Sequence, residues 1–136
     1  HTINALWPVA VEQGKIAGAN MAGETISYQG SVGMNSLEFF GLAIVSLGIY
    51  KVKEGDSAIE ELKLMDLKHN LYKKITLRNN IIVGTILAGD IKASGVFLRL
   101  IRERVDVSPF KDRLLEENFG YPTVKDFVKS KERIYV

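Results

Sequence analysis

The fold is decided by the stretch Leu71-Tyr72-Lys73-Lys74-Ile75-Thr76-Leu77-Arg78-Asn79-Asn80-Ile81-Ile82-Val83-Gly84-Thr85-Ile86-Leu87-Ala88. Two segments with strand character, 71–77 and 81–88, flank the pair Asn79-Asn80. Because asparagine tolerates the left-handed backbone angles of a tight hairpin turn, the pair predicts a β-hairpin. The second segment is apolar on both faces of a strand, so we expect it in the centre of a sheet.

Further strands are predicted upstream of this hairpin. Residues 59–67 alternate between apolar and charged side chains, which is typical of a strand with one buried face. Residues 36–50 are predicted as one longer strand, in which Gly41 introduces a bulge or bend. Gly55-Asp56 predicts a turn between these strands. Together with the hairpin they predict an antiparallel β meander.

Downstream of the hairpin the apolar spacing changes from that of strands to that of helices. An amphipathic helix is predicted over residues 91–104. Ser108-Pro109 is expected to cap a second short helix that Gly120 ends, and a third is predicted to begin at Thr123. The predicted fold class is α+β, an antiparallel β meander with an N-terminal helix and C-terminal helices.

The N-terminal helix is predicted to run from Pro8 to about Met21. Proline suits a first turn, where its missing N–H would be unpaired anyway, and Gly23 is typical of the position just beyond a helix. Small or flexible residues recur on one face, at Ala10, Gly14, Ala17, Gly18 and Met21. Each interior glycine costs about 0.8–1 kcal/mol relative to alanine, which favours a close neighbour for the helix backbone. Spacing alone favours tight packing on the rest of the core, with close approach of a cofactor as the alternative.

Composition limits the function classes. The 136 residues fit one domain, and the net charge of +2 is too small to indicate nucleic acid or an acidic membrane surface. No apolar run reaches the roughly 20 residues of a transmembrane helix. Cysteine is absent, which excludes disulfides and thiolate metal sites and is compatible with the cytoplasmic location that we expect. Through residue 50 the charged residues are Glu12, Lys15, Glu24 and Glu38, so this part is expected to pack against something else.

The sequence contains no recognisable catalytic constellation. The histidines are His1 and His69, and His69 lies in a predicted turn with Asp66. Two ligands on a turn hold a metal poorly, so we interpret His69 as a solvated residue and predict no metal site. The acidic pairs Glu60-Glu61 and Glu116-Glu117 are interpreted as surface and edge residues rather than as an acid and base. We therefore predict no catalytic residue.

A group of arginines could meet an anionic partner. Its members are Arg99, Arg102, Arg104 and Arg113. The C-terminus of a helix attracts cations, and together with a solvated surface this explains the group more simply.

The N-terminal run resembles a known family. The run is Ala5-Leu6-Trp7-Pro8-x-Ala10-Val11-Glu12-Gln13-Gly14-x-Ile16-Ala17-Gly18-x-Asn20-Met21-Ala22-Gly23. It resembles the last helix of the flavin-binding domain in pyridine nucleotide–disulfide oxidoreductase-like enzymes, of the NADH oxidase, rubredoxin reductase and nitrite reductase large-subunit group. Segments 35–48 and 82–90 resemble the C-terminal domain of that group. The resemblance implies that residues 1–24 are a stub of the FAD-binding domain and residues 25–136 a C-terminal, dimerisation-type domain.

The resemblance also implies a role for the start of the first helix. In such enzymes this helix points its N-terminus at the pyrimidine end of the flavin, where its dipole stabilises negative charge. The resemblance assigns Trp7, Pro8 and Ala10 to this flavin-facing start, in the intact parent only. The glycine-rich dinucleotide motifs and a redox-active cysteine are absent. FAD and NAD(P)H are therefore expected in the parent, whereas the fragment alone should bind no cofactor and be inactive.

The implied function is that of a C-terminal domain in an FAD-dependent NAD(P)H:acceptor oxidoreductase, which packs over the flavin and forms subunit or acceptor contacts. The expected partners are the missing FAD and NAD domains, a second subunit and an electron-carrier protein such as rubredoxin, with no nucleic acid and no membrane. The arginine-rich helices could face that carrier. One alternative from a different class stays open, a non-enzymatic protein-interaction module.

Overall fold

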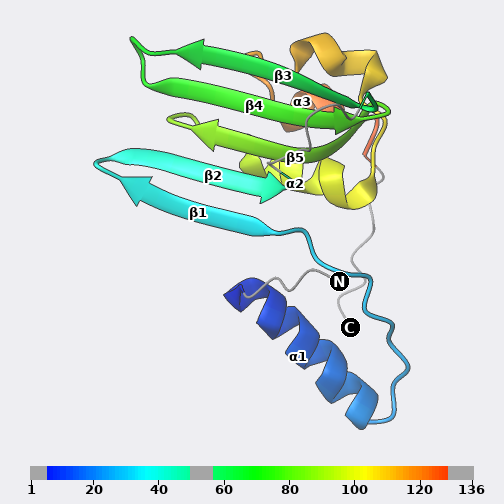
Figure 1. Ribbon diagram of the computed structural model, residues 1–136. Helices are drawn as coiled ribbons and strands as arrows, with labels where there is room; N and C mark the ends of the chain where they lie inside the picture. The colour runs from blue at the N-terminus through cyan, green and yellow to red at the C-terminus, as the bar shows by residue number, and fades with distance from the viewer. Residues whose placement is uncertain (1–5, 50–56, 129–136) are drawn as a thin grey trace.

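The computed structural model describes residues 6–49 and 57–128, which form a five-stranded sheet with flanking helices (Figure 1). The strands are β1 (Met34–Phe39), β2 (Leu42–Gly48), β3 (Ile59–Asp66), β4 (Leu71–Arg78) and β5 (Ile81–Ala88). The helices are α1 (Trp7–Met21), α2 (Ser94–Glu103), the 3-10 helix η1 (Ser108–Arg113) and α3 (Tyr121–Val124). The predicted α+β class, with helices before and after an antiparallel sheet, is confirmed.

The strand order across the sheet is β1-β2-β5-β4-β3, and every neighbouring pair is antiparallel. β5 lies in the centre, as its apolar residues on both faces predicted. β3, β4 and β5 follow one another as a meander, but β2 pairs with β5 and not with β3. The sheet is therefore a three-stranded meander extended on one side by the β1–β2 hairpin.

The predicted hairpin between β4 and β5 is confirmed. Asn79 and Asn80 both have positive φ, 50° and 58°, as a two-residue turn of this kind requires. β3 is confirmed over nearly all of its predicted range, ending at Asp66. The predicted turn at Gly55-Asp56 lies outside the described residues.

The prediction of a single strand over residues 36–50 is wrong. β1 ends at Phe39 and β2 begins at Leu42, and these two residues pair with each other. Phe40 and Gly41 form the turn between them, with φ of 49° and 77°. Gly41 therefore reverses the chain instead of bending a strand, because a left-handed residue pair closes a hairpin.

One face of the sheet carries the hydrophobic core, and the C-terminal helices cover it (Figure 1). The buried cluster comprises Val45, Leu47, Ile75, Leu77, Ile82, Leu87, Ala93, Phe97, Leu100, Val107, Phe110, Leu114, Phe119, Val124 and Val128. Phe97 of α2 is almost fully buried and stacks on Phe119, with ring centroids 5.0 Å apart. These contacts join the chain after β5 to the sheet.

The C-terminal helices are shorter than predicted. α2 begins at Ser94, and the second helix is a 3-10 turn interrupted at Phe110, whose φ of −138° is not helical. The side-chain cap predicted at Ser108 is absent, because the residue before the helix is Val107 and no side chain caps it. Asp106 Oδ1 instead accepts hydrogen bonds from Ser108 N–H (2.9 Å) and Oγ (2.7 Å). α3 begins at Tyr121 and not at Thr123, and spans 4 residues.

The prediction for α1 is confirmed at both ends. Pro8 lies in the first turn. At the other end Gly23 has φ of 100° and its N–H donates to Asn20 O (3.2 Å), while Glu24 N–H donates to Ala19 O (3.1 Å). This pair of bonds is a Schellman motif. Figure 1 shows α1 on the β1 side of the sheet.

Candidate functional site

The N-terminus of α1 is the place that the resemblance assigned to a flavin. Trp7, Pro8 and Ala10 lie together in its first turns, and Trp7 is 82% exposed. Ala10 is exposed as well. Leu6 precedes the helix in an extended conformation, no side-chain cap is present among the described residues, and the first turn holds no acidic residue. The positive end of the helix dipole therefore has no side-chain partner among the described residues, and an uncapped helix N-terminus attracts negative charge.

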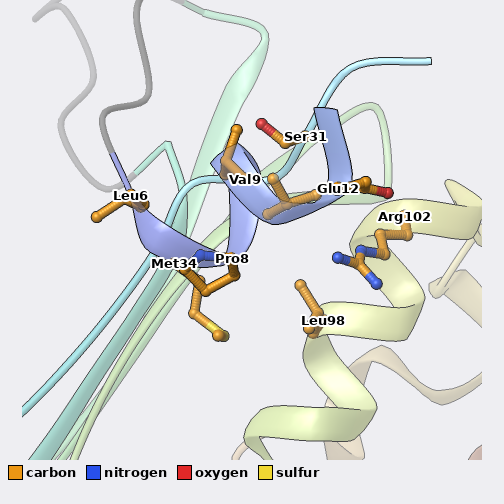
Figure 2. Close-up of a pocket in the computed structure, with 9 residues that line it drawn as sticks. Leu6, Pro8, Val9, Glu12, Ser31, Met34, Leu98 and Arg102 are labelled. Carbon is orange, nitrogen blue, oxygen red and sulfur yellow. The ribbon is translucent and has the colours of Figure 1, made fainter. Parts of the chain in front are cut away.

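A small pocket lies where α1 meets β1 and α2 (Figure 2). It is lined by Leu6, Pro8, Val9, Glu12, Ser31, Val32, Met34, Leu98 and Arg102. Pro8 lies beside Met34 of β1, while Leu98 and Arg102 reach the pocket from α2 (Figure 2). Val9 is the buried residue of α1, with 6% of its surface exposed. The helix thus contacts the rest of the described chain through its first turns.

The face of α1 that carries Gly14 and Gly18 packs against no other described residue. A Cβ atom added at Gly14 or Gly18 would meet no described atom within 4 Å, and Met21 is 88% exposed. The expectation of tight packing on the core is therefore wrong for the described part of the chain. Gly84 shows the contrast, because a Cβ atom there would lie 1.9 Å from Ile49 O. The glycine of β5 thus has a close neighbour among the described residues, whereas Gly14 and Gly18 of α1 have none there.

Asn20 fixes the chain where it leaves α1. Its Nδ2 donates to Ile26 O (3.0 Å), and Ile26 N–H donates to its Oδ1 (2.7 Å). This reciprocal pair holds the following loop against the last turn of the helix. Sequence reasoning missed the role, and the signal was an asparagine three residues before the terminating Gly23.

Two of the arginines predicted on helix surfaces are engaged by neighbouring carboxylates. Arg99 Nε donates to Glu103 Oε1 at 2.9 Å, and Arg113 Nε donates to Glu116 Oε2 at 3.2 Å. Arg99 and Glu103 lie one turn apart within α2, whereas Glu116 follows the end of η1 at Arg113. These pairs leave Arg99 and Arg113 poorly suited to capture an external anion.

The other two arginines line a cleft near the C-terminal end of α2. Arg102 and Arg104 share this cleft with Arg78 of β4, and Glu12 is its acidic member. Arg104 caps α2 in the left-handed conformation, with φ of 51°. Sequence reasoning missed Arg78, because only the tertiary fold brings the β4–β5 hairpin beside the end of α2. The cleft has an excess of positive charge.

His69 belongs to a turn-closing pair with Asp66. His69 Nδ1 lies 2.6 Å from Asp66 Oδ2, and Asp66 Oδ1 accepts the backbone N–H groups of Lys68 (3.0 Å) and His69 (3.2 Å). The side-chain hydrogen bond raises the pKa of His69 above its ordinary value and lowers the pKa of Asp66. Among residues 6–49 and 57–128, no group of three or more His, Asp or Glu side chains is placed to hold a metal ion.

The acidic pair on β3 is neutralised by lysines. Glu61 accepts ion pairs from Lys63 (2.6 Å) and Lys74, whose hydrogen bonds lower the pKa of the Glu61 carboxyl. Glu60 pairs with Lys111 of η1. The interpretation of this pair as surface and edge residues agrees with these contacts.

Lys73 is the charged residue that sequence reasoning did not single out. It lies in β4 with 3% of its surface exposed. Its Nζ donates to Glu116 O at 3.2 Å and lies 3.5 Å from Asp90 Oδ2. The signal was its place in the alternation Leu71, Lys73, Ile75, which puts it on the core face of the strand.

Comparison with known proteins agrees with the resemblance. Residues 34–105 match the family described as the rubredoxin NAD+ reductase C-terminal domain. The nitrite reductase [NAD(P)H] of Bacillus subtilis is 37% identical over 98 residues, which is 71% of this chain and 12% of that protein. The epsilon subunit of the NADH-dependent phenylglyoxylate dehydrogenase of Aromatoleum evansii is 32% identical over 116 residues, 83% of this chain and 27% of that subunit.

A third relative is matched over most of the chain. The assimilatory nitrate reductase electron transfer subunit of Bacillus subtilis is 27% identical over 130 residues, 95% of this chain and 16% of that subunit. The chain thus spans between 12% and 27% of the length of these relatives. No helix in the described ranges has the length and apolar character needed to cross a bilayer. Its sequence and fold place the chain in the rubredoxin NAD+ reductase C-terminal domain family of NAD(P)H-linked oxidoreductases.

Proposed function

We propose that this chain is the C-terminal part of an FAD-dependent NAD(P)H:acceptor oxidoreductase. Residues 1–24 would form the last helix of its flavin-binding domain, and residues 25–136 the C-terminal domain. The observation that carries the proposal is the open small-residue face of α1. Gly14 and Gly18 each cost the helix about 0.8–1 kcal/mol relative to alanine, and no described atom packs against them. A flavin-binding domain upstream would supply the missing neighbour.

In the complete protein α1 would direct its first-turn N–H groups at the flavin. Trp7, Pro8 and Ala10 would form this contact, since Pro8 starts the helix and Ala10 leaves room for close approach. When bound, FAD would accept a hydride equivalent from NAD(P)H and pass electrons to the acceptor. The positive end of α1 would stabilise the negative charge that the reduced ring carries. The chain alone is expected to bind neither cofactor.

The proposed partners follow from two surfaces. The N-terminal part, with its open helix face, would pack on the FAD and NAD domains and on a second subunit. The cleft formed by Arg78, Arg102 and Arg104 would receive an acidic electron-carrier protein. Arg99 and Arg113 are left out of this proposed carrier contact, because both are paired with glutamates. A cytoplasmic location is part of the proposal, and the absence of cysteine from this chain is compatible with it.

The flavin content of the full-length protein tests the proposal. We expect purified full-length protein to show a flavin spectrum that NADH bleaches. Gly14→Leu should reduce the flavin content, because the added side chain separates α1 from its neighbour. The matched control is Gly95→Leu on α2, where an added Cβ atom also meets no described atom within 4 Å. A full-length protein without flavin, or equal flavin loss in both variants, would contradict the proposal.

A carrier-binding role for the arginine cleft has its own test. Arg102→Gln with Arg104→Gln in the full-length protein should raise the apparent KM for an acidic carrier such as rubredoxin. The control is Arg113→Gln, which removes an arginine that is paired with Glu116. An unchanged KM would remove the cleft from the proposal without affecting the flavin assignment.

A further inference from the structure

An arginine ends α2 in a backbone conformation that glycine usually occupies. Arg104 has φ of 51° and ψ of 47°, in the left-handed region. Helices commonly end with a glycine or an asparagine in this region, because a β-carbon is disfavoured there. Asparagines also occupy it in this chain, at Asn70, Asn79 and Asn80. An arginine held there at a conformational cost indicates a use for its side chain.

Arg104 shares its cleft with two more arginines and one acid. Arg102 of α2 and Arg78 of β4 line the cleft with it, and Glu12 of α1 is the acidic member. Arg102 projects from α2 toward α1 (Figure 2). Within residues 6–49 and 57–128, Arg102 and Arg104 form no ion pair. Three positive charges and one negative charge leave the cleft with a formal excess of two positive charges.

The end of α2 does not cancel this charge. The last carbonyls of a helix carry partial negative charge when they are unpaired. Here Ile101 O accepts the N–H of Arg104 at 3.3 Å. Leu100 O accepts the N–H of Val105 at 3.1 Å. The carboxylate of Glu103 is held at 2.9 Å by an arginine one turn earlier in its own helix. The guanidinium groups therefore set the sign of the potential in the cleft.

The floor of the cleft is aliphatic. It is formed by Val32, Ile49, Ile81, Val83 and Ile101, of which Ile49 is 49% exposed. The cleft has a volume of about 740 Å³, within the range of roughly 300–1,000 Å³ that small-molecule sites have. An acidic protein surface supplies carboxylates for the arginines but no apolar group for this floor. The combination indicates a small ligand with an anionic group and an apolar body.

We propose that this cleft binds a phosphate monoester with an apolar body, such as a nucleoside monophosphate or an alkyl phosphate. The phosphate contacts Arg102 and Arg104, because a planar guanidinium donates two parallel hydrogen bonds to such a group. A phosphate monoester carries about −1.5 to −2 charges at neutral pH, which matches the excess of two positive charges. A carboxylate supplies a single charge. The body of the ligand covers Ile49 and Ile101. This binding site goes beyond the proposed function.

Isothermal titration calorimetry of the 136-residue chain tests the site, at a pH above the second pKa of a phosphate ester, about 6. We expect hexyl phosphate to bind at one site. Inorganic phosphate should bind roughly tenfold or more weakly, because it removes no apolar surface from water. Hexanoate should also bind more weakly, since it carries one charge. Adenosine monophosphate is the second ester, and the tighter of the two esters identifies a nucleoside or an aliphatic body.

Arg104→Gly separates binding from folding. Glycine suits φ of 51°, so the free energy of unfolding should be at least that of the unsubstituted chain. Affinity for hexyl phosphate should fall roughly tenfold or more, because a hydrogen bond to a charged group is lost. Arg113→Gln is the matched control, since Arg113 is paired with Glu116 outside the cleft, and it should leave the affinity unchanged.

Ile49→Asn tests the aliphatic floor. Ile49 is 49% exposed, so its substitution should leave the chain folded. We expect weaker binding of hexyl phosphate, because the asparagine removes apolar surface from the cleft. Binding of inorganic phosphate should stay unchanged, since inorganic phosphate does not use the floor.

In the full-length protein the ligand should compete with the electron carrier, a consequence that rests on the proposed function. Both would use Arg102 and Arg104, so hexyl phosphate should raise the apparent KM for rubredoxin and leave kcat unchanged. Binding without competition would remove the carrier from the cleft and leave the phosphate site in place. The calorimetry does not depend on flavin, so it tests the site even where the proposed function fails.

Three calorimetric results would overturn the proposal. The first is a folded chain that does not bind hexyl phosphate. The second is equal affinity for hexyl phosphate and inorganic phosphate, since the floor would then contribute nothing. The third is an affinity that Arg104→Gly leaves unchanged, or that Arg113→Gln lowers equally.

Discussion

Strands β2 to β5 with the C-terminal helices differ from residues 6–40 in how they use apolar side chains. In the first region Leu47, Ile75 and Phe97 are nearly or fully buried in one shared core. In the second, Trp7 is 82% and Phe40 95% exposed, and charged residues are few. The difference teaches that the first region stabilises itself, whereas the second exposes apolar surface of the kind that marks a contact with another partner.

The largest contrast should appear on truncating one aromatic residue in each region. Phe97→Ala should lower the free energy of unfolding by about 3–5 kcal/mol, because it opens a cavity beside Phe119. Trp7→Ala should change it by less than about 0.5 kcal/mol, as for other exposed positions. Urea unfolding of the two variants measures both values. Similar losses would show that α1 belongs to the same cooperative unit.

A smaller effect is expected at the buried charge in the sheet. Lys73→Ala should cost about 1–3 kcal/mol, because it leaves Asp90 and the Glu116 carbonyl without their buried donor. Lys63→Ala removes an exposed lysine from the neighbouring strand and should leave stability unchanged within error. Chemical denaturation of both variants provides the measurement. A neutral Lys73→Ala would mean that solvent replaces its contacts.

Substitutions at glycines should change α1 in opposite directions. Gly14→Ala should stabilise the helix by about 0.8–1 kcal/mol in this chain, since no described atom opposes a Cβ atom there. Gly23→Ala should destabilise its end, because φ of 100° is strained for a side-chain residue. Circular dichroism reports the helix content. A loss of helix in Gly14→Ala would reveal a close neighbour that the open face excludes.

The smallest effect concerns the His69–Asp66 pair. The pKa of His69 is raised in the folded protein, so the stability that His69 contributes is lost as the pH rises through that pKa. The pKa of Asp66 is lowered, so the stability that Asp66 contributes is lost as the pH falls through that pKa. The contribution is thus complete between the ordinary values of 3.8 and 6.5. NMR titration should place the pKa of His69 above 6.5, and Asp66→Asn should return it toward that value. An unshifted His69 would contradict the pair.

Sequence alone predicted the elements that carry their own signals. Asn79-Asn80 marked the central hairpin, and Pro8 with Gly23 marked the ends of α1. The β1–β2 hairpin was missed because Phe40-Gly41 lacks the usual first turn residue, so two strands looked like one. Phe40, the turn residue that the sequence pattern did not mark, is also the most exposed aromatic side chain among the described residues.

The site was less predictable than the fold, because its contacts join distant parts of the chain. The interior glycines of α1 indicated a close neighbour, but spacing did not say whether that neighbour lies in this chain. Lys73 pairs with Asp90, and Arg78 shares a cleft with residues at the end of α2. Both contacts join residues that lie far apart in the sequence. The flavin-facing role of Trp7, Pro8 and Ala10 came from family resemblance and stays a prediction.

Amide hydrogen exchange in α1 tests the central claim most directly. It should be measured in the 136-residue chain and in the full-length protein. We expect the amides of residues 7–21 to exchange much faster than those of β4 and β5 in the chain alone, and to become protected in the full-length protein. Equal protection of α1 in both proteins would contradict the account, because the helix would then need no neighbour beyond this chain.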